Sequence, residues 1–367
     1  MQSLDLYIDV TEAAGLGEPA TVALTVTLPD AGTLPVERPI VCFAKPGGGY
    51  SRGYYTVDLP GPARGAQADW HAARGWIFVS VDHLGVGGSS THHEAASLDY
   101  TRLAATAHAA EREVLHRLAA GTLADGFPAV TDPVVLGIGQ SMGGCMTVVQ
   151  QGRYESYDGI GILGYSAVHT TPATRPGTTP IIPAWMPRDV IPKKWVQADP
   201  LSDPGVVNKA LMLADSLRSG DKASGPAMAW GFHYDDIDPS ILVQDLTDFP
   251  TRNGNPPPWA SATLPAVVAV WCIVPGAIAP EAAAVSVPVL VAMGERDVIA
   301  DPKGEPRAYQ SATSIDFFRC PRMGHMHNFA GTRELFWRRI ETWAEWVRVE
   351  KDARRQAPAP APETALA

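Results

Sequence analysis

The chain of 367 residues has only four cysteines and contains no long apolar run. None of the cysteines has Cys-x-x-Cys spacing, so we expect small buried thiols rather than disulfides or a metal site. No segment reaches the roughly 18 uninterrupted apolar residues of a membrane span. The N-terminus, MQSLDLYIDVTEAAG, lacks the basic flank and apolar core of a signal peptide. These absences predict a cytoplasmic protein.

Clustered basic residues are also absent, and the formal net charge is −10. Phosphate backbones are bound by clustered Lys and Arg, so we expect no nucleic-acid partner. The same charge argues against an anionic membrane surface. The stretch KPGGGY lacks the Gly-Lys-Ser/Thr ending of a phosphate-binding loop. We therefore expect no cofactor and no metal, while the oligomeric state stays open.

The apolar residues that are present follow two patterns. Residues 4–10 and 22–28 alternate apolar and polar side chains, which predicts an antiparallel ribbon of half-buried strands. Later runs are almost continuously apolar, as in strands buried on both faces. These runs are RPIVCFAKPGG, GWIFVSVDH, DPVVLGIGQS, DGIGILGYS, VPVLVAMGERD and SIDFFRC. Stretches of helical character separate them, so we predict an α/β fold with a mostly parallel sheet and helices on both faces.

One region, residues 167–284, breaks this alternation. Prolines crowd together there with five of the ten tryptophans, Trp185, Trp195, Trp230, Trp259 and Trp271. The region is too apolar for a solvated linker, so we interpret it as an inserted cap subdomain. The core then comprises residues 1–166 and 285–352. Residues 353–367 are rich in Pro and Ala and are expected to form a disordered tail.

The stretch Gly139-Gln140-Ser141-Met142-Gly143 fits G-x-S-x-G between a predicted strand and a predicted helix. A sharp turn there would present the serine hydroxyl at the carboxyl edge of the sheet, and flanking glycines would relieve the crowding. A simple turn residue is the alternative interpretation. We predict that Ser141 is a nucleophile.

A serine needs a base, and the base needs an acid to hold its tautomer. The segment RCPRMGHMHNF follows the last predicted strand and holds His325 and His327. The glycine before His325 lets the chain bend there, which favours His325 as the base. Asp297 follows the strand VPVLVAMG and is the predicted acid, with Asp301 in reserve and Glu295 less favoured.

Three successive glycines in AKPGGGYSRGYY would let backbone amides approach an oxyanion. We expect one of Gly48, Gly49 or Tyr50 to donate together with the amide of Met142; a purely structural loop is the alternative. The side chains expected to contact substrate are Tyr50, Gln140, Trp185 and Trp230.

These motifs together resemble the serine hydrolases of the α/β-hydrolase superfamily. The resemblance lies in the serine turn, the order Ser141, Asp297, His325, and the stretch DHLGVGGS at residues 82–89, which matches D-x-x-G-x-G-x-S. It implies an eight-stranded sheet with the insertion as a cap over the site. Two departures remain: Lys45-Pro46-Gly47-Gly48 replaces the family's usual His-Gly, and the cap matches no subfamily pattern.

The predicted activity is hydrolysis of a carboxylic ester or lactone of an apolar small molecule through an acyl-enzyme on Ser141. A serine in this turn argues against the dehalogenase and epoxide-hydrolase branches, which need a carboxylate nucleophile. An acyltransferase with the same residues is one alternative. A ligand-binding member of the fold without turnover is the other.

Overall fold

The computed structural model describes residues 1–35, 37–92, 98–177, 183, 185 and 227–356. Much of the predicted cap, including Trp195, and residues 357–367 of the predicted tail lie outside the described residues. Within the described residues the strands form one eight-stranded sheet in the order β1-β2-β4-β3-β5-β6-β7-β8. The strands are β1 Gln2–Asp9, β2 Thr21–Leu28, β3 Ile40–Lys45, β4 Ile77–Val81, β5 Val134–Gln140, β6 Gly159–Leu163, β7 Val289–Gly294 and β8 Ile315–Cys320.

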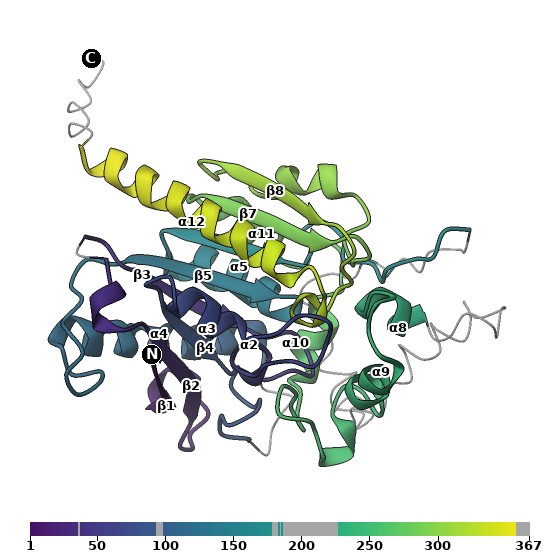
Figure 1. Ribbon diagram of the computed structural model, residues 1–367, viewed down its shortest axis with the longest axis horizontal. Helices are drawn as coiled ribbons and strands as arrows, with labels where there is room; N and C mark the ends of the chain where they lie inside the picture. The colour runs from purple at the N-terminus through teal and green to yellow at the C-terminus, as the bar shows by residue number, and fades with distance from the viewer. Residues whose placement is uncertain (36, 93–97, 178–182, 184, 186–226, 357–367) are drawn as a thin grey trace.

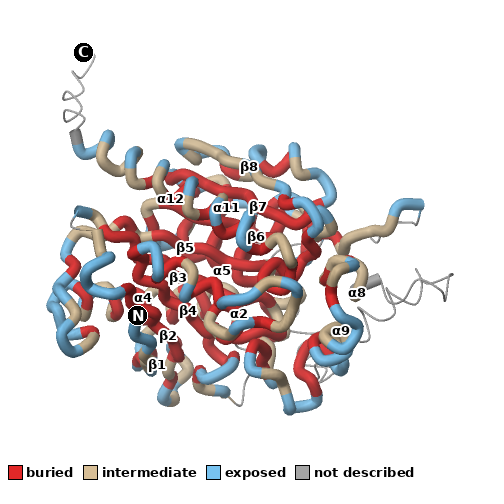
Figure 2. Tube along the Cα trace, in the orientation of Figure 1, coloured by how far each residue is buried: buried red, intermediate tan, exposed pale blue. Residues whose placement is uncertain are grey.

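Strand pairing confirms the predicted sheet. β1 and β2 form the antiparallel ribbon, β2 pairs antiparallel with β4, and every other pairing is parallel. All residues of β3, β4, β6 and β7 are buried, and Figure 2 shows the centre of the sheet enclosed. A strand covered by helices on both faces has no solvent side, which is why these runs are apolar without alternation. Two predictions of burial are wrong: β2 is buried along almost its whole length, and β8 is largely accessible because it lies at the edge of the sheet.

Helices cover both faces of the sheet (Figure 1). α4 (Tyr100–Ala120) and α5 (Met142–Tyr154) share one hydrophobic core with the sheet. α3 (Gln67–Ala72) and α12 (Arg333–Gln356) share the other. One stripe of α12 is buried, made up of Phe336, Ile340, Trp343 and Val347. α12 also corrects one boundary, because residues 353–356 are helical and were assigned to the tail.

The remaining helices are short. They are α1 Thr11–Ala14, α2 Gly53–Thr56, α8 Ala227–Phe232, α9 Pro239–Leu246, α10 Ala266–Trp271 and α11 Ala279–Ala284, with the 3-10 turns η1 Ala31–Thr33, η3 Arg252–Gly254, η4 Pro302–Ala308 and η5 His327–Phe329. α8 and α9 lie beyond the end of the sheet toward which the parallel strands point (Figure 1). α11 instead packs on α5, where Gly152 lies against the backbone of Glu281.

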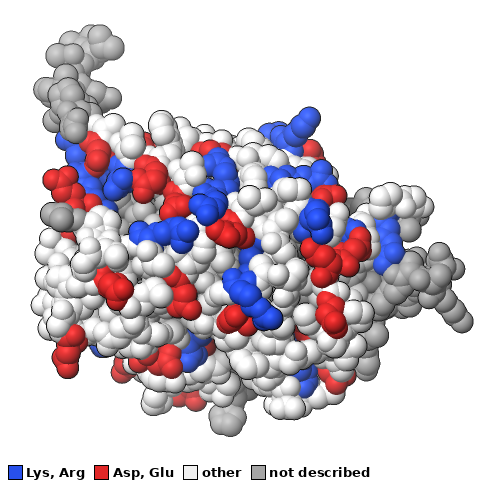
Figure 3. Space-filling view, viewed as in Figure 1, with Lys and Arg blue, Asp and Glu red and all other residues white. Residues whose placement is uncertain are grey.

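The burial of the cysteines and the mixed charge of the surface are as the composition predicts. Cys42, Cys145, Cys272 and Cys320 are buried, as expected. Lys and Arg are interspersed with Asp and Glu over the face shown in Figure 3. Among the described helices, none combines the length and apolar character needed to cross a bilayer.

Candidate active site

Ser141 occupies the turn between the last residue of β5 and the first residue of α5. Its backbone has φ 54° and ψ −120°, a conformation that non-glycine residues rarely adopt. The Ser141 amide donates to the Leu163 carbonyl at 2.8 Å, which ties the turn to β6. The Ser141 carbonyl in turn accepts the amides of Gly144 and Cys145 in the first turn of α5. The predicted strand–serine–helix turn is therefore present.

The two flanking glycines are required by close backbone contacts. A Cβ atom on Gly139 would lie 2.1 Å from the Gly143 carbonyl oxygen. A Cβ atom on Gly143 would lie 2.1 Å from the carbonyl oxygen of Lys45 on β3. The G-x-S-x-G spacing is thus a packing requirement of this turn.

Asp297 lies in the loop after β7, and each of its carboxylate oxygens accepts two hydrogen bonds. Oδ1 accepts from the Val298 amide and from Nδ1 of His325, both at 2.7 Å. Oδ2 accepts from the Gly294 amide and from Nε2 of His327, both at 2.7 Å. Burial raises the pKa of the Asp297 carboxyl, but the two imidazoles and their hydrogen bonds outweigh burial and hold this pKa well below its usual range. Asp297 is therefore ionised at neutral pH.

The two histidines use different ring nitrogens. Because an ionised carboxylate only accepts, the nitrogen of each ring that faces Asp297 carries its proton. His325 uses Nδ1, which leaves Nε2 next to the carboxamide of Gln140, at 3.3 Å. His327 uses Nε2, and its buried Nδ1 has no hydrogen-bond partner among the described residues. Burial lowers the pKa of His327 against the opposing effect of Asp297.

The other predicted acids do not contact these histidines. Asp301 pairs with Arg307 at 3.2 Å, and both side chains are exposed. Glu295 is exposed, and its carboxylate accepts the Arg322 amide at 2.8 Å. Of the three carboxylates considered, the structure brings Asp297 to the histidine loop.

The histidine loop is also held from the predicted cap. The His325 amide donates to the Gly231 carbonyl and the Met326 amide to the Phe232 carbonyl, both at 2.8 Å. The Phe232 ring lies 5.1 Å from the His325 ring. Sequence reasoning missed this support, because backbone carbonyls at the end of α8 leave no signature in the residue types.

The glycine loop after β3 has most of its carbonyls fixed. The donors are the Tyr55 hydroxyl to Lys45 O at 2.8 Å, His83 Nε2 to Pro46 O at 3.0 Å, the Tyr50 amide to Gly47 O at 3.1 Å and the Ser261 amide to Gly49 O at 3.1 Å. The His83 ring acts as a neutral donor, since burial lowers its pKa to about 4. The loop is therefore held in one conformation.

The amides of the three successive glycines in this loop stay unbonded. No acceptor among the described residues bonds the amides of Gly47, Gly48 and Gly49, whereas the Tyr50 amide is used inside the loop. A Cβ atom on Gly48 would lie 3.7 Å from the sulfur of Met142, so this residue faces the start of α5. This corrects one of the three predicted donors: Tyr50 has no free amide.

The predicted substrate residues have different surroundings. The Tyr50 hydroxyl is buried and donates to Asp245 at 2.8 Å, so it is not available to a substrate. Gln140 is buried beside His325 and donates to its carbonyl at 3.0 Å. Trp230 stacks on Arg296, with 4.7 Å from the guanidinium carbon to the ring centre. Trp185 is 69% exposed.

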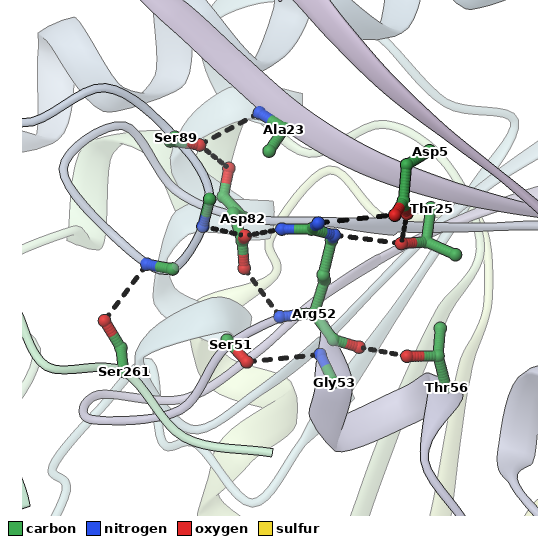
Figure 4. A network of polar contacts seen from close by, with 12 residues as sticks. Asp5, Ala23, Thr25, Ser51, Arg52, Gly53, Thr56, Asp82, Ser89 and Ser261 are labelled. Carbon is green, nitrogen blue, oxygen red and sulfur yellow. Dashed lines mark hydrogen bonds and ion pairs between the residues drawn. The ribbon is translucent and has the colours of Figure 1, made fainter. Parts of the chain in front are cut away.

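The D-x-x-G-x-G-x-S loop is anchored by Arg52, a residue that the sequence analysis did not single out. Its partner in this loop is Asp82. Asp82 is fully buried and accepts from the Arg52 amide at 2.6 Å and the Gly88 amide at 2.8 Å (Figure 4). The Arg52 guanidinium lies between Asp82 and Thr25, bonding the latter at 2.9 Å. Burial raises the pKa of Asp82 against the opposing effect of Arg52. Since Arg52 follows the glycine loop directly, this network joins the two loops.

Comparison with known proteins identifies the fold. No protein-family model and no curated protein matches the sequence. The structure is similar to a thermophilic esterase from Thermogutta terrifontis, at 13% identity over 93% of this chain and 99% of that chain, with a TM-score of 0.55. It is also similar to an enol-lactonase from Burkholderia xenovorans, at 13% identity over 88% of this chain and 96% of that chain (TM-score 0.51). A loop variant of a haloalkane dehalogenase from Bradyrhizobium elkanii matches at 13% identity over 96% and 100% (TM-score 0.54). The chain has the α/β-hydrolase fold.

Proposed function

We propose that the protein is a serine hydrolase that cleaves a carboxylic ester or lactone of an apolar small molecule. The observation that carries the proposal is the strained Ser141 turn combined with the buried Asp297–His325 pair. These residues follow β5, β7 and β8, which run parallel. Parallel strands present their carboxyl ends at one edge of the sheet, so the three residues share that edge.

Each of the three residues has a distinct role in the proposed acyl transfer. Ser141 Oγ attacks the carbonyl carbon, and its proton moves to Nε2 of His325. The tetrahedral intermediate collapses when His325 gives that proton to the leaving alcohol, which leaves an acyl-enzyme. Water then attacks the acyl-enzyme and gives a proton to His325. His325 passes that proton to Ser141 Oγ as the carboxylic acid leaves. Asp297 holds the proton on Nδ1 of His325, so that Nε2 is the basic nitrogen.

The proposed oxyanion donors are the amides of Met142 and Gly48, with Gly49 as the neighbouring alternative. Met142 is the first residue of α5, where amides have no intrahelical acceptor. Gly48 lies against Met142 and has an unbonded amide, as described above. Fixed donors of this kind stabilise charge that develops in the transition state, without reorganisation at the moment of reaction.

The nature of the substrate rests on the composition of the insertion. Residues 167–284 hold half of the tryptophans and are proposed to form the cap over the site. A cap of this composition would favour an apolar acyl or alcohol group. An acyltransferase would use the same residues with an alcohol or thiol in place of water. A binding protein without turnover would show ligand affinity and no acyl-enzyme.

A fluorophosphonate probe tests the proposal. The serine oxygen displaces fluoride from phosphorus, so a stable adduct forms on an activated serine. We expect mass spectrometry to find the adduct on Ser141, and the labelled protein to lose hydrolysis of a panel of esters and lactones. An adduct on another residue, or full hydrolysis after labelling, would exclude Ser141 as the nucleophile.

A further inference from the structure

A buried carboxylate in the insertion has no part in the proposed chemistry. Asp245 on α9 is fully buried, and its carboxylate accepts from four side chains of both the core and the insertion. The donors are the Tyr50 hydroxyl at 2.8 Å, His233 Nε2 at 2.8 Å, Trp259 Nε1 at 2.9 Å and Arg252 Nη2 at 3.5 Å. Burial raises the pKa of Asp245, but these partners outweigh it and lower the pKa below its usual value, so the group is charged.

Arg252 provides the balancing charge and carries it to the glycine loop. Its side chain is almost fully buried. Nη2 and Nε donate to the Asp245 carbonyl, at 2.9 and 3.2 Å. Nη1 donates to the carbonyls of Gly49 and Pro250. Gly49 has φ +81°, and a Cβ atom there would lie 2.9 Å from Nη1, so the guanidinium fits against a bare backbone.

These contacts fix the orientation of the loop amides. The Tyr50 amide bonds the Gly47 carbonyl, which closes a turn over residues 47–50. The C=O and N–H of a trans peptide point in opposite directions, so the Gly48 amide points away from the inside of this turn. Arg252 holds the Gly49 carbonyl, and Asp245 holds the Tyr50 side chain. The end of the turn is thereby fixed from the insertion, while Tyr55 and His83 hold its start from the core.

We propose that Asp245 and Arg252 are positioning residues that hold the glycine loop so that its free amides face the Ser141 turn. The inference rests on the proposed function, because it assigns the loop as the oxyanion site. Oxyanion donors act on the transition state more than on the bound substrate. Loss of either positioning residue should therefore lower kcat and leave KM almost unchanged.

The experiment compares Arg252→Gln, Arg252→Lys and Tyr50→Phe with the parent protein. We expect Arg252→Gln to lower kcat on a small soluble ester by about 10–100-fold with KM within about threefold, below the full loss of an oxyanion donor. Arg252→Lys should recover part of the loss, because it keeps a cation near the Gly49 carbonyl. Tyr50→Phe removes one hydroxyl and should cost about 3–10-fold in kcat, on the scale of one ordinary hydrogen bond, because Asp245 keeps its other donors.

A matched control separates positioning from general destabilisation. Glu281→Gln weakens a partly buried ion pair with Arg153, 3.0 Å long, in the last turn of α5, whereas the glycine loop lies against the first residue of that helix. We expect this variant to lower the thermal midpoint and to keep kcat within about twofold of the parent. The second-order rate of fluorophosphonate labelling at Ser141 should fall in the Arg252 and Tyr50 variants by the factor seen in kcat, and stay constant in Glu281→Gln.

Two results would overturn the inference. One is a rise in KM with parental kcat, which would assign Arg252 to substrate binding. The other is parental labelling and kcat in all three loop variants. If Arg252→Gln does not fold, Tyr50→Phe decides alone, because it removes only a hydroxyl. Failure of the parent to label at Ser141 would instead reject the proposed function, so the two failures are distinguishable.

Discussion

The loops at the edge of the sheet and residues 231–261 of the insertion contribute to the candidate site in different ways. The sheet loops carry groups that can react, such as Ser141, Asp297 and His325. The insertion contributes groups that hold backbone: Gly231 accepts the His325 amide, and Arg252 donates to the Gly49 carbonyl. On the proposed function the insertion would do more than cover the site, because it bonds the backbone of both the proposed base and the glycine loop.

A serine from each region gives the sharpest test of this division. Ser141→Ala should lower kcat by about 10⁴-fold or more, since it removes the nucleophile. Ser261→Ala should lower kcat by at most about threefold, because its hydroxyl accepts the amides of Gly87 and Thr263, at 3.0 and 3.1 Å, and has no reacting group among its partners. Steady-state kinetics on one small ester, with circular dichroism to confirm folding, compares them. Similar losses in both variants would show that the division between reacting and holding regions is wrong.

The two histidines of the loop after β8 are expected to differ in their effect on kcat. We expect His325→Ala to lower kcat by about 10³–10⁴-fold, because it removes the proposed base, whose Nε2 lies beside Gln140, the residue before Ser141. His327→Ala removes one of four donors to Asp297 and should cost about tenfold.

Kinetics of the two histidine variants under identical conditions gives this ranking directly. The reverse ranking would move the base to His327 and leave the fold unaffected. Parental activity in both variants would exclude a Ser–His–Asp mechanism.

The insertion tryptophans should have smaller effects. Trp185→Ala and Trp230→Ala are expected to change KM for long-chain esters severalfold, while kcat on a small ester stays within about twofold. The measurement is a series of esters of increasing chain length. A uniform fall of kcat on every ester in Trp230→Ala would assign Trp230 to support of Arg296, on which its ring stacks.

A buried carboxylate where the core meets the first residue of the insertion should make stability depend on pH. Glu305 is buried in η4, and its carboxylate accepts from the Ser166 hydroxyl and from the Ala167 amide at 3.1 Å. Burial raises the pKa of Glu305 to about 7, from 4.5, against the opposing hydrogen bonds. The raised pKa stabilises the folded state fully below pH 4.5, and this contribution is lost as the pH rises through 7.

The size of this contribution is at most about 3 kcal/mol in the free energy of unfolding. Urea unfolding of the parent and of Glu305→Gln at pH 5 and pH 8 measures it as a difference between the two proteins. We expect the parent to lose more stability than the variant between these pH values. An equal loss in both would show that Glu305 titrates normally in the folded state.

Much of the fold was predictable from short patterns. Continuous apolar runs predicted the strands β3 to β8, and alternation predicted the ribbon of β1 and β2, because burial acts directly on residue choice. The burial of β2 and the exposure of β8 were not predictable in this way, since they depend on the place of each strand in the sheet. The serine turn was predictable for a similar reason: Gly139 and Gly143 are dictated by local backbone contacts. The preference for Asp297 and His325 rested on their positions after strands, since strand ends meet at one edge.

Only the tertiary structure decided how the site is held. Nothing near Asp245 or Arg252 in the sequence indicates that both reach the glycine loop. Arg252 and Gly49 are 203 positions apart in the chain. The sequence also offered two histidines as partners for one acid. In the folded chain both bond Asp297, His325 through Nδ1 and His327 through Nε2. Local patterns record burial and turns because these act on neighbouring residues. Contacts between distant loops depend on the packing of the whole sheet and insertion, and a single sequence contains no periodic trace of them.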